Sequence, residues 1–193
     1  MSAGRIIVAG LVGGIAMFSW GAIAHMALPI GEMGFKSLPP EAEAKLVPHM
    51  KSEIKERGFY FFPGGDMHTA TEEQTKAWEE KLRQGPQGIL VYQPAGGEAM
   101  GPMTLGTEFA SNALASLMLA IVLSRVRGGW SVRLMIGAAL GLFGWASLCV
   151  SYWNWYNFPT DFTIGQGIEQ VVGGLFAAAG VALVLGREKT LAH

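Results

Sequence analysis

Four apolar stretches, each long enough to cross a lipid bilayer, constrain the fold of this chain more than any other feature. They cover residues 6–28, 105–124, 132–153 and 162–186. A hydrocarbon core of about 30 Å takes about 20 helical residues at 1.5 Å each. The first stretch ends near Ala22-Ile23-Ala24, which resembles a signal-peptide cleavage site, but its apolar run is longer than the usual signal core of about 7–15 residues. We therefore expect four membrane-spanning helices, including the first.

Charged residues are concentrated between the first and second apolar stretches. The chain has 15 acidic and 14 basic residues, and residues 30–104 hold eleven of the acidic and eight of the basic ones. The only cysteine, Cys149, lies inside the third stretch. A single cysteine excludes an internal disulfide, a CxxC redox pair, a zinc site built from several thiolates and CxxCH haem attachment.

The short segments beside the four stretches differ in their basic residues. Bases precede the first stretch, surround the connection between the second and third, and follow the fourth: Arg5, Arg125, Arg127, Arg133, Arg187 and Lys189. The connection at 154–161 has no base. Because cytoplasmic flanks are enriched in Lys and Arg, we expect a multi-pass protein of the bacterial inner membrane. Both termini would be cytoplasmic, and residues 30–104 extracytoplasmic.

The hydrophilic segment carries its own folding signals. Pro39-Pro40 predicts the start of a helix that Gly58 would end, with Pro48 kinking or splitting it. The pair Thr71 and Gln74 has capping-box spacing for a second helix, and residues 59–62 and 89–92 resemble short strands. The order helix, strand, helix, strand allows the two strands to pair in parallel through a βαβ crossover.

The predicted fold is an all-α membrane protein, a four-helix transmembrane bundle with a small α+β insertion between its first two helices. The regions are a first transmembrane helix at 1–29, the extracytoplasmic module and linker at 30–104, and three transmembrane helices with a short cytoplasmic C-terminus at 105–193. A two-stranded module of this size lies near the limit of independent stability. We therefore expect it to rest on the bundle or on a partner.

Small residues recur at four-residue spacing in all four stretches. The pairs are Gly10/Gly14, Ser111/Ala115, Gly137/Gly141 and Gly173/Ala177. Within lipid, such faces let helices approach closely. They predict a compact antiparallel bundle, and one face could also dock onto the helices of another subunit.

Three ionisable residues inside the stretches share faces with these small residues, at similar depths: His25, Glu108 and Glu169. An isolated carboxylate in the membrane interior is costly and needs a partner or a proton. One interpretation is a hydrogen-bonded polar layer that fixes helix register, with Glu169 protonated or paired to His25. The alternatives are a polar pocket that opens outward for a small ligand or proton, and a metal held by all three side chains.

An aromatic run at residues 152–159 is the most unusual local sequence of the chain. Such runs are typical of the aromatic belt at headgroup depth. The alternative is a stacking surface for a quinone, pigment or lipid. Its candidate ligand-binding residues would be Trp153, Asn154, Trp155 and Tyr156, together with Gln166.

No motif for catalysis or nucleotide binding is present. P-loop, nucleophile-elbow, HExxH and dinucleotide fingerprints are all missing, and no basic stripe indicates nucleic-acid binding. We expect a non-catalytic accessory or assembly subunit of a larger bacterial inner-membrane complex, for example in electron transport. Its partners would be the lipid bilayer and other membrane subunits. The alternative is a ligand- or metal-binding membrane protein, with an enzyme among the options, that uses the polar pocket. A transporter is a third option, disfavoured because no broken helix or inverted repeat is evident.

Overall fold

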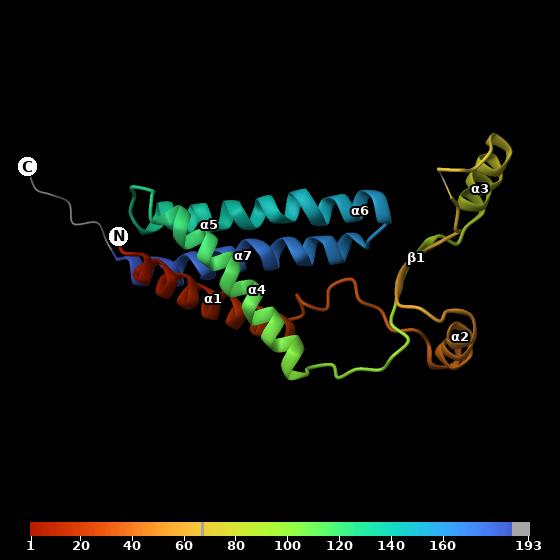
Figure 1. Cartoon of the computed structure of the whole chain (residues 1–193), viewed down its shortest axis with the longest axis horizontal. Coiled ribbons are helices and arrows are strands. Elements are labelled where there is room, and N and C mark those ends of the chain that lie inside the picture. The colour runs from red at the N-terminus through yellow and green to blue at the C-terminus, as the bar shows by residue number, and fades with distance from the viewer. Residues whose placement is uncertain (67, 187–193) are drawn as a thin grey trace, which may run out of the picture. The chain divides into compact units, whose positions relative to one another are not determined.

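The computed structural model describes residues 1–66 and 68–186, which are mostly helical (Figure 1). The elements are α1 (Ala3–Met26), α2 (Pro40–Glu53), β1 (Gly58–Phe62), α3 (Glu72–Gln84), β2 (Gly88–Tyr92), α4 (Pro102–Leu123), α5 (Trp130–Gly144), a π-helical turn (Trp145–Cys149), α6 (Val150–Tyr156) and α7 (Thr160–Leu185). They form two compact units. One combines Met1–Phe35 with the described residues from Ala99 to Gly186, and the other is Lys36–Glu98.

Four helices of the first unit are long and apolar enough to cross a membrane. They are Ala3–Met26, Pro102–Leu123, Trp130–Tyr156 and Thr160–Leu185, where the third joins α5, the π-helical turn and α6. The four predicted spans are therefore confirmed as helices, and a multi-pass membrane protein fits them. Length and hydropathy identify these helices because a helix pairs its own backbone groups, as the lipid interior requires.

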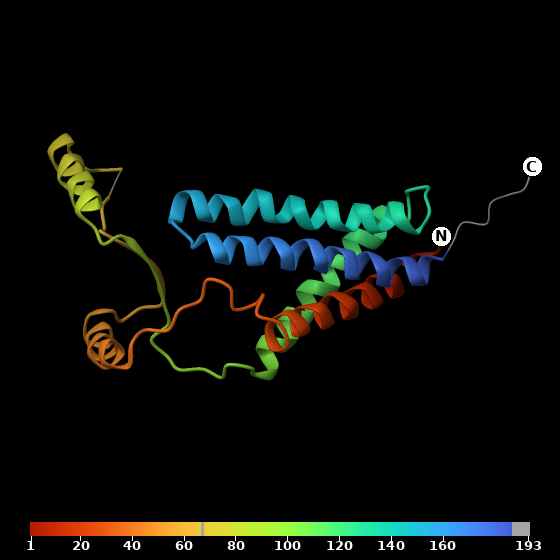
Figure 2. The same cartoon turned by 180° about the vertical axis from the view of Figure 1, so that it is seen from behind.

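Helix α7 packs against α1 and α5, and α1 also packs against α4, as both views of the bundle show (Figures 1 and 2). Glycines allow these close approaches. A Cβ atom added at Gly14 of α1 would lie 2.6 Å from the Ala113 Cα of α4, and one added at Gly137 would meet the backbone of Gly174. The predicted glycine faces of α1, α5 and α7 therefore serve contacts within the bundle. The Ser111/Ala115 pair of α4 is exposed instead.

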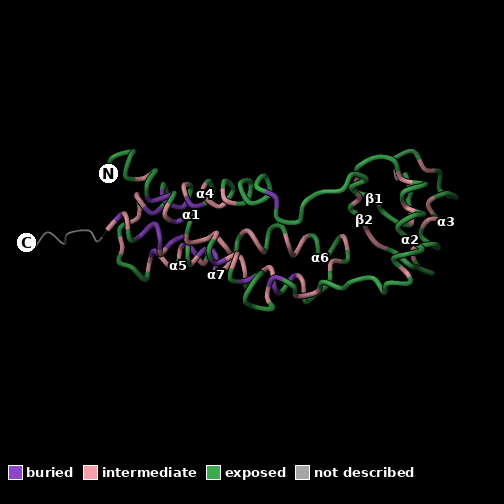
Figure 3. The backbone as a smooth tube through the Cα atoms, turned by 90° about the horizontal axis from the view of Figure 1, so that it is seen from below, coloured by how far each residue is buried: buried purple, intermediate pink, exposed green. Residues whose placement is uncertain are grey.

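The main cluster of buried apolar side chains occupies one half of the bundle, where α1 begins and α4 and α7 end (Figure 3). We call this the terminal half. The buried residues of this cluster are Ala9, Leu119, Ala120, Leu123, Ala177, Ala178, Val181 and Leu185. Half of them are alanines, which lets the helix backbones come close together.

Two arginines close the carboxyl end of α7 in the terminal half. Arg5 donates from Nε to the Val184 carbonyl (3.0 Å) and from a terminal nitrogen to the Leu185 carbonyl (2.9 Å). Arg133 of α5 donates to the Gly186 carbonyl at 2.7 Å and is 4% exposed. The last carbonyls of a helix lack partners within the helix and carry partial negative charge. The guanidinium groups therefore donate hydrogen bonds to these carbonyls and place positive charge at the negative end of the helix.

In the unit Lys36–Glu98, β1 and β2 pair antiparallel, with Phe59 opposite Val91. The parallel pairing predicted from the sequence is wrong. A crossover helix must cover the sheet with a broad apolar face, whereas α3 has few apolar side chains. Its Trp78 instead donates from Nε1 to the Pro63 carbonyl (3.0 Å), which attaches α3 to the turn after β1. After α3 the chain forms β2, which runs antiparallel beside β1.

The other predictions for this unit are confirmed in part. Thr71 and Gln74 form the predicted capping box at the start of α3. Helix α2 continues through Pro48 without splitting and ends at Glu53, before Gly58, which begins β1 instead. None of the described residues in this unit is buried.

Candidate functional site

A cavity of about 510 Å³ lies in the other half of the bundle, between the end of α1 and the first turns of α4 and α7. We call this the cavity half. The polar lining comes from His25, Thr104, Glu108, Gln166, Glu169 and Gln170. Apolar side chains, including Phe18, Met26, Met100 and Leu105, form the rest of the wall. The cavity is therefore amphipathic and lies within one unit of the chain.

His25 and Glu169 meet in this cavity. His25 Nε2 lies 3.0 Å from Glu169 Oε1, and Gln166, one turn earlier on α7, donates from Nε2 to Glu169 Oε2 at 3.3 Å. Both carboxylate oxygens of Glu169 therefore have partners. The His25 side chain is 49% exposed and that of Glu169 is 19% exposed. The pair is thus reachable from the cavity mouth, and the expected meeting of these two residues is confirmed.

The chain after α1 folds back over the His25 ring. Gly31 donates its backbone N–H to the Ala24 carbonyl at 3.1 Å. A Cβ atom added at Gly31 would lie 2.8 Å from the His25 Cα and would also meet the imidazole, so no side chain fits there. Farther along, Met33 packs against Gly165 of α7. Gly31 therefore lies against the Nδ1 side of the imidazole, whereas Glu169 lies at Nε2.

Glu108 enters the cavity wall from α4. Its Oε1 accepts a hydrogen bond from Asn112 Nδ2 at 3.1 Å, one turn along the same helix. The contacts of the described residues give the Glu108 carboxylate no other hydrogen-bond or ionic partner. Glu108 thus differs from Glu169, because its carboxylate contacts a neutral amide and no ionisable group within the described part of the chain.

The three predicted metal ligands line one cavity but do not form one coordination sphere. Within residues 1–66 and 68–186 there is no group of three or more His, Cys, Asp or Glu side chains that could hold a metal ion. The reason is visible in the contacts: His25 bonds to Glu169, whereas Glu108 bonds to Asn112.

The aromatic candidates lie apart from this cavity. Trp153 donates from Nε1 to Thr160 Oγ1 at 3.1 Å, Trp155 is 73% exposed, and Asn154 is exposed as well. Tyr156 lies beside Tyr152, with ring centroids 5.7 Å apart. Of the predicted aromatic site, only Gln166 lines the cavity, because its spacing places it one turn before Glu169 on α7.

Sequence reasoning did not include Phe18, Thr104 and Gln170 among the site residues. A signal for Phe18 existed, because it shares a helix face with Gly21 and His25 at spacings of three and seven residues. Thr104 stands one turn before Glu108, and Gln170 directly follows Glu169. Which faces of α4 and α7 converge depends on helix crossing, which no single helix pattern contains.

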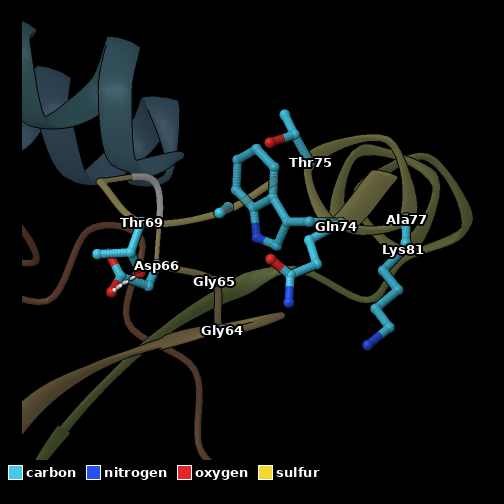
Figure 4. Close-up of a pocket in the computed structure, with 10 residues that line it drawn as sticks. Gly64, Gly65, Asp66, Thr69, Gln74, Thr75, Ala77 and Lys81 are labelled. Carbon is cyan, nitrogen blue, oxygen red and sulfur yellow. Dashed lines mark hydrogen bonds between the residues drawn. The ribbon is translucent and has the colours of Figure 1, made fainter. Parts of the chain in front are cut away.

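A second cavity, of about 330 Å³, lies in the unit Lys36–Glu98 between the turn after β1 and helix α3 (Figure 4). Its wall includes Asp66, Thr69, Gln74 and Lys81. Asp66 accepts hydrogen bonds from Thr69 Oγ1 (2.7 Å) and His68 N (3.0 Å). These bonds, the first above all, hold the pKa of Asp66 below its ordinary value of 3.8. Both carboxylate oxygens of Asp66 therefore accept hydrogen bonds from residues of the same turn.

No protein-family model, curated protein or solved structure matches this chain. Its function is therefore argued from its own residues.

Proposed function

We propose that this chain is a non-catalytic accessory or assembly subunit of a larger complex in the bacterial inner membrane. The observation that carries the proposal is the lack of a core in the unit Lys36–Glu98, none of whose described residues is buried. Ordering the backbone costs about 1–2 kcal/mol per residue, and burial of apolar surface must offset that cost. A partner subunit would supply the missing burial.

The surface of this unit suits a protein partner. Val91 of β2 is 74% exposed, and Leu38, Leu46 and Phe62 are 49%, 45% and 45% exposed. Charged side chains of α2 and α3 lie among them. Interfaces combine an apolar centre with a polar rim, and this unit carries both components. An electron-transport complex is the class to examine first.

The same proposal places both termini in the cytoplasm and the unit Lys36–Glu98 outside it. Support comes from the arginines, since Arg5 and Arg133 lie at one end of the bundle and Arg125 and Arg127 lie in the turn after α4. A Cys149→Ser background makes single-cysteine labelling possible. We expect an impermeant maleimide added to intact cells to label Ser52→Cys and to spare Ser2→Cys; the reverse pattern would overturn this topology.

Purification from native membranes tests the accessory role. We expect the tagged full chain to migrate with partner subunits on blue native gels. The substitution Val91→Glu should lower partner recovery at unchanged expression, because it adds a charge to an exposed apolar strand position. Glu73→Gln, on the exposed surface of α3, should leave recovery unchanged. A lone monomer or a simple homodimer would overturn the proposal, as would equal recovery with Val91→Glu.

A second candidate role, small-molecule binding, is favoured by the cavity in the bundle. Its volume of about 510 Å³ lies within the range of about 300–1,000 Å³ typical of ligand sites. Native mass spectrometry of the full chain should detect a retained small molecule that is lost from the His25→Ala/Glu169→Gln variant. If nothing is retained and the substitutions change only stability, this role fails.

A further inference from the structure

We propose that the cavity between α1, α4 and α7 binds a protonated organic amine with a short apolar body. This inference rests on the second role above, small-molecule binding in the bundle, and names the class of ligand. It starts from the charges of the cavity wall and from the way each charged group is partnered.

The wall contains more acidic than basic groups. Glu108 and Glu169 contribute carboxyl groups. Among the described residues of the lining, His25 is the one group that can be cationic, since neither Lys nor Arg is among them. His25 Nε2 lies 3.0 Å from Glu169 Oε1. Among the residues that the structure describes, the Glu108 carboxylate has only the Asn112 amide as a partner, at 3.1 Å. Glu108 is thus the acid without a counter-charge.

An unbalanced acid inside a membrane-spanning helix favours a cation. Glu108 lies in the second turn of the candidate span Pro102–Leu123. A carboxylate in a membrane-spanning helix is unfavourable unless it is paired or protonated, and this cost falls from the bilayer centre toward the interface. A ligand ammonium group would supply the missing positive charge and up to three N–H donors. Acceptors for these donors are the Glu108 carboxylate and the Gln166 amide oxygen, because Gln166 already uses Nε2 on Glu169.

The remaining wall selects an organic cation. Phe18, Met26, Met100 and Leu105 line the cavity, and their apolar surface gains nothing from a hydrated inorganic ion. An aromatic ring such as that of Phe18 also attracts ammonium groups through its π face. The volume of about 510 Å³ leaves room for a hydrocarbon chain beside the ammonium group.

The test uses three probes of equal length that differ in charge: octylamine, octanol and octanoate. Each is titrated against the purified full chain in lipid nanodiscs, with empty nanodiscs as the reference for partitioning, and saturable binding is measured by equilibrium dialysis. We expect saturable binding of octylamine, at least about tenfold weaker binding of octanol and no saturable binding of octanoate. A factor of ten corresponds to the loss of one charge-assisted hydrogen bond.

Matched variants locate the binding. Glu108→Gln keeps the shape of the side chain and its contact with Asn112 but removes the charge, so octylamine affinity should fall at least about tenfold. Asp161→Asn removes a carboxylate from the first turn of α7, outside the cavity lining, and should leave the affinity unchanged.

The outcomes separate the two proposals. Equal saturable binding of octanol and octylamine, or an octylamine affinity that Glu108→Gln leaves unchanged, overturns the amine proposal while the cavity remains a binding site. Preference for octanoate also overturns it. Absence of saturable binding for all three probes overturns the amine proposal and leaves the binding role to native mass spectrometry alone.

Discussion

Glycine has opposite roles in the two halves of the bundle. Helix α1 passes through both. In the terminal half, Gly14 brings its backbone against Ala113, and an added Cβ atom would lie 2.6 Å from the Ala113 Cα. In the cavity half, Gly21 lines open space: apart from its own stretch of α1, no atom of the described residues lies within 4 Å of an added Cβ. One glycine therefore permits contact, whereas the other leaves room.

If the cavity binds a ligand as proposed, this difference separates the stabilising part of the bundle from the binding part. The buried apolar core belongs to the terminal half, where α7 is closed by two arginines. The polar side chains of the cavity half stand around a space that a ligand can fill. A site can retain unfilled volume and partly paired acids when close packing elsewhere stabilises the fold.

The largest expected effect comes from adding the same side chain to the two glycines of α1. Gly14→Val should lower the free energy of unfolding by about 3 kcal/mol, because the new atoms collide with the α4 backbone. Gly21→Val should change it by less than about 0.5 kcal/mol, since the cavity accepts the side chain. Equilibrium unfolding in mixed detergent micelles measures both, and equal losses would abolish the distinction between the halves.

A smaller loss is expected on removing an arginine from the end of α7. Arg133→Met should destabilise the bundle by about 2 kcal/mol, because the Gly186 carbonyl loses a buried charged donor at 2.7 Å. Arg133→Lys should lose less, since it keeps a positive charge near the helix end. The matched control is Arg127→Met in the exposed turn after α4. If it costs as much, general charge rather than capping explains the result.

The sequence predicted the spans and the principal polar pair for physical reasons that act within single helices. Length and hydropathy determine which segments can cross lipid. The positions of His25 and Glu169 on small-residue faces indicated that they point at neighbouring helices rather than at lipid. Their separation of 3.0 Å agrees with that expectation. Their function stays a prediction.

The features that the sequence did not predict depend on how elements meet. Parallel pairing of β1 and β2 was compatible with the element order. It failed because α3 anchors through Trp78 to the turn at Pro63 and does not cover the sheet. Gln166 was assigned to an aromatic wall, yet it bonds to Glu169, three residues away on its own helix. The three-residue spacing within α7 was enough to predict the contact between Gln166 and Glu169. It was not enough to predict that this face of α7 meets α1 and α4 around the cavity.

The third prediction concerns the polar pair of the cavity half. A double-mutant cycle of His25→Gln and Glu169→Gln should give a coupling energy of about 0.6 kcal/mol, typical of polar contacts between membrane helices. The His25 side chain is 49% exposed, so solvent screens the interaction. Unfolding of the wild type, both single variants and the double variant measures it. A coupling above about 2 kcal/mol would make this pair a main support of the fold, contrary to the proposed separation.

The smallest effect should have the opposite sign. Ser116 lies in the terminal half with 0% exposure, and its hydroxyl has no hydrogen-bond partner among the described residues. A buried polar group without a partner lowers stability. Ser116→Ala should therefore raise the free energy of unfolding by about 0.5–1 kcal/mol, whereas Ser111→Ala, on the exposed face of α4, should change it little. A loss of stability in Ser116→Ala would mean that the hydroxyl has a partner in the membrane, such as a bound water. The packed half would then share a polar feature with the cavity half.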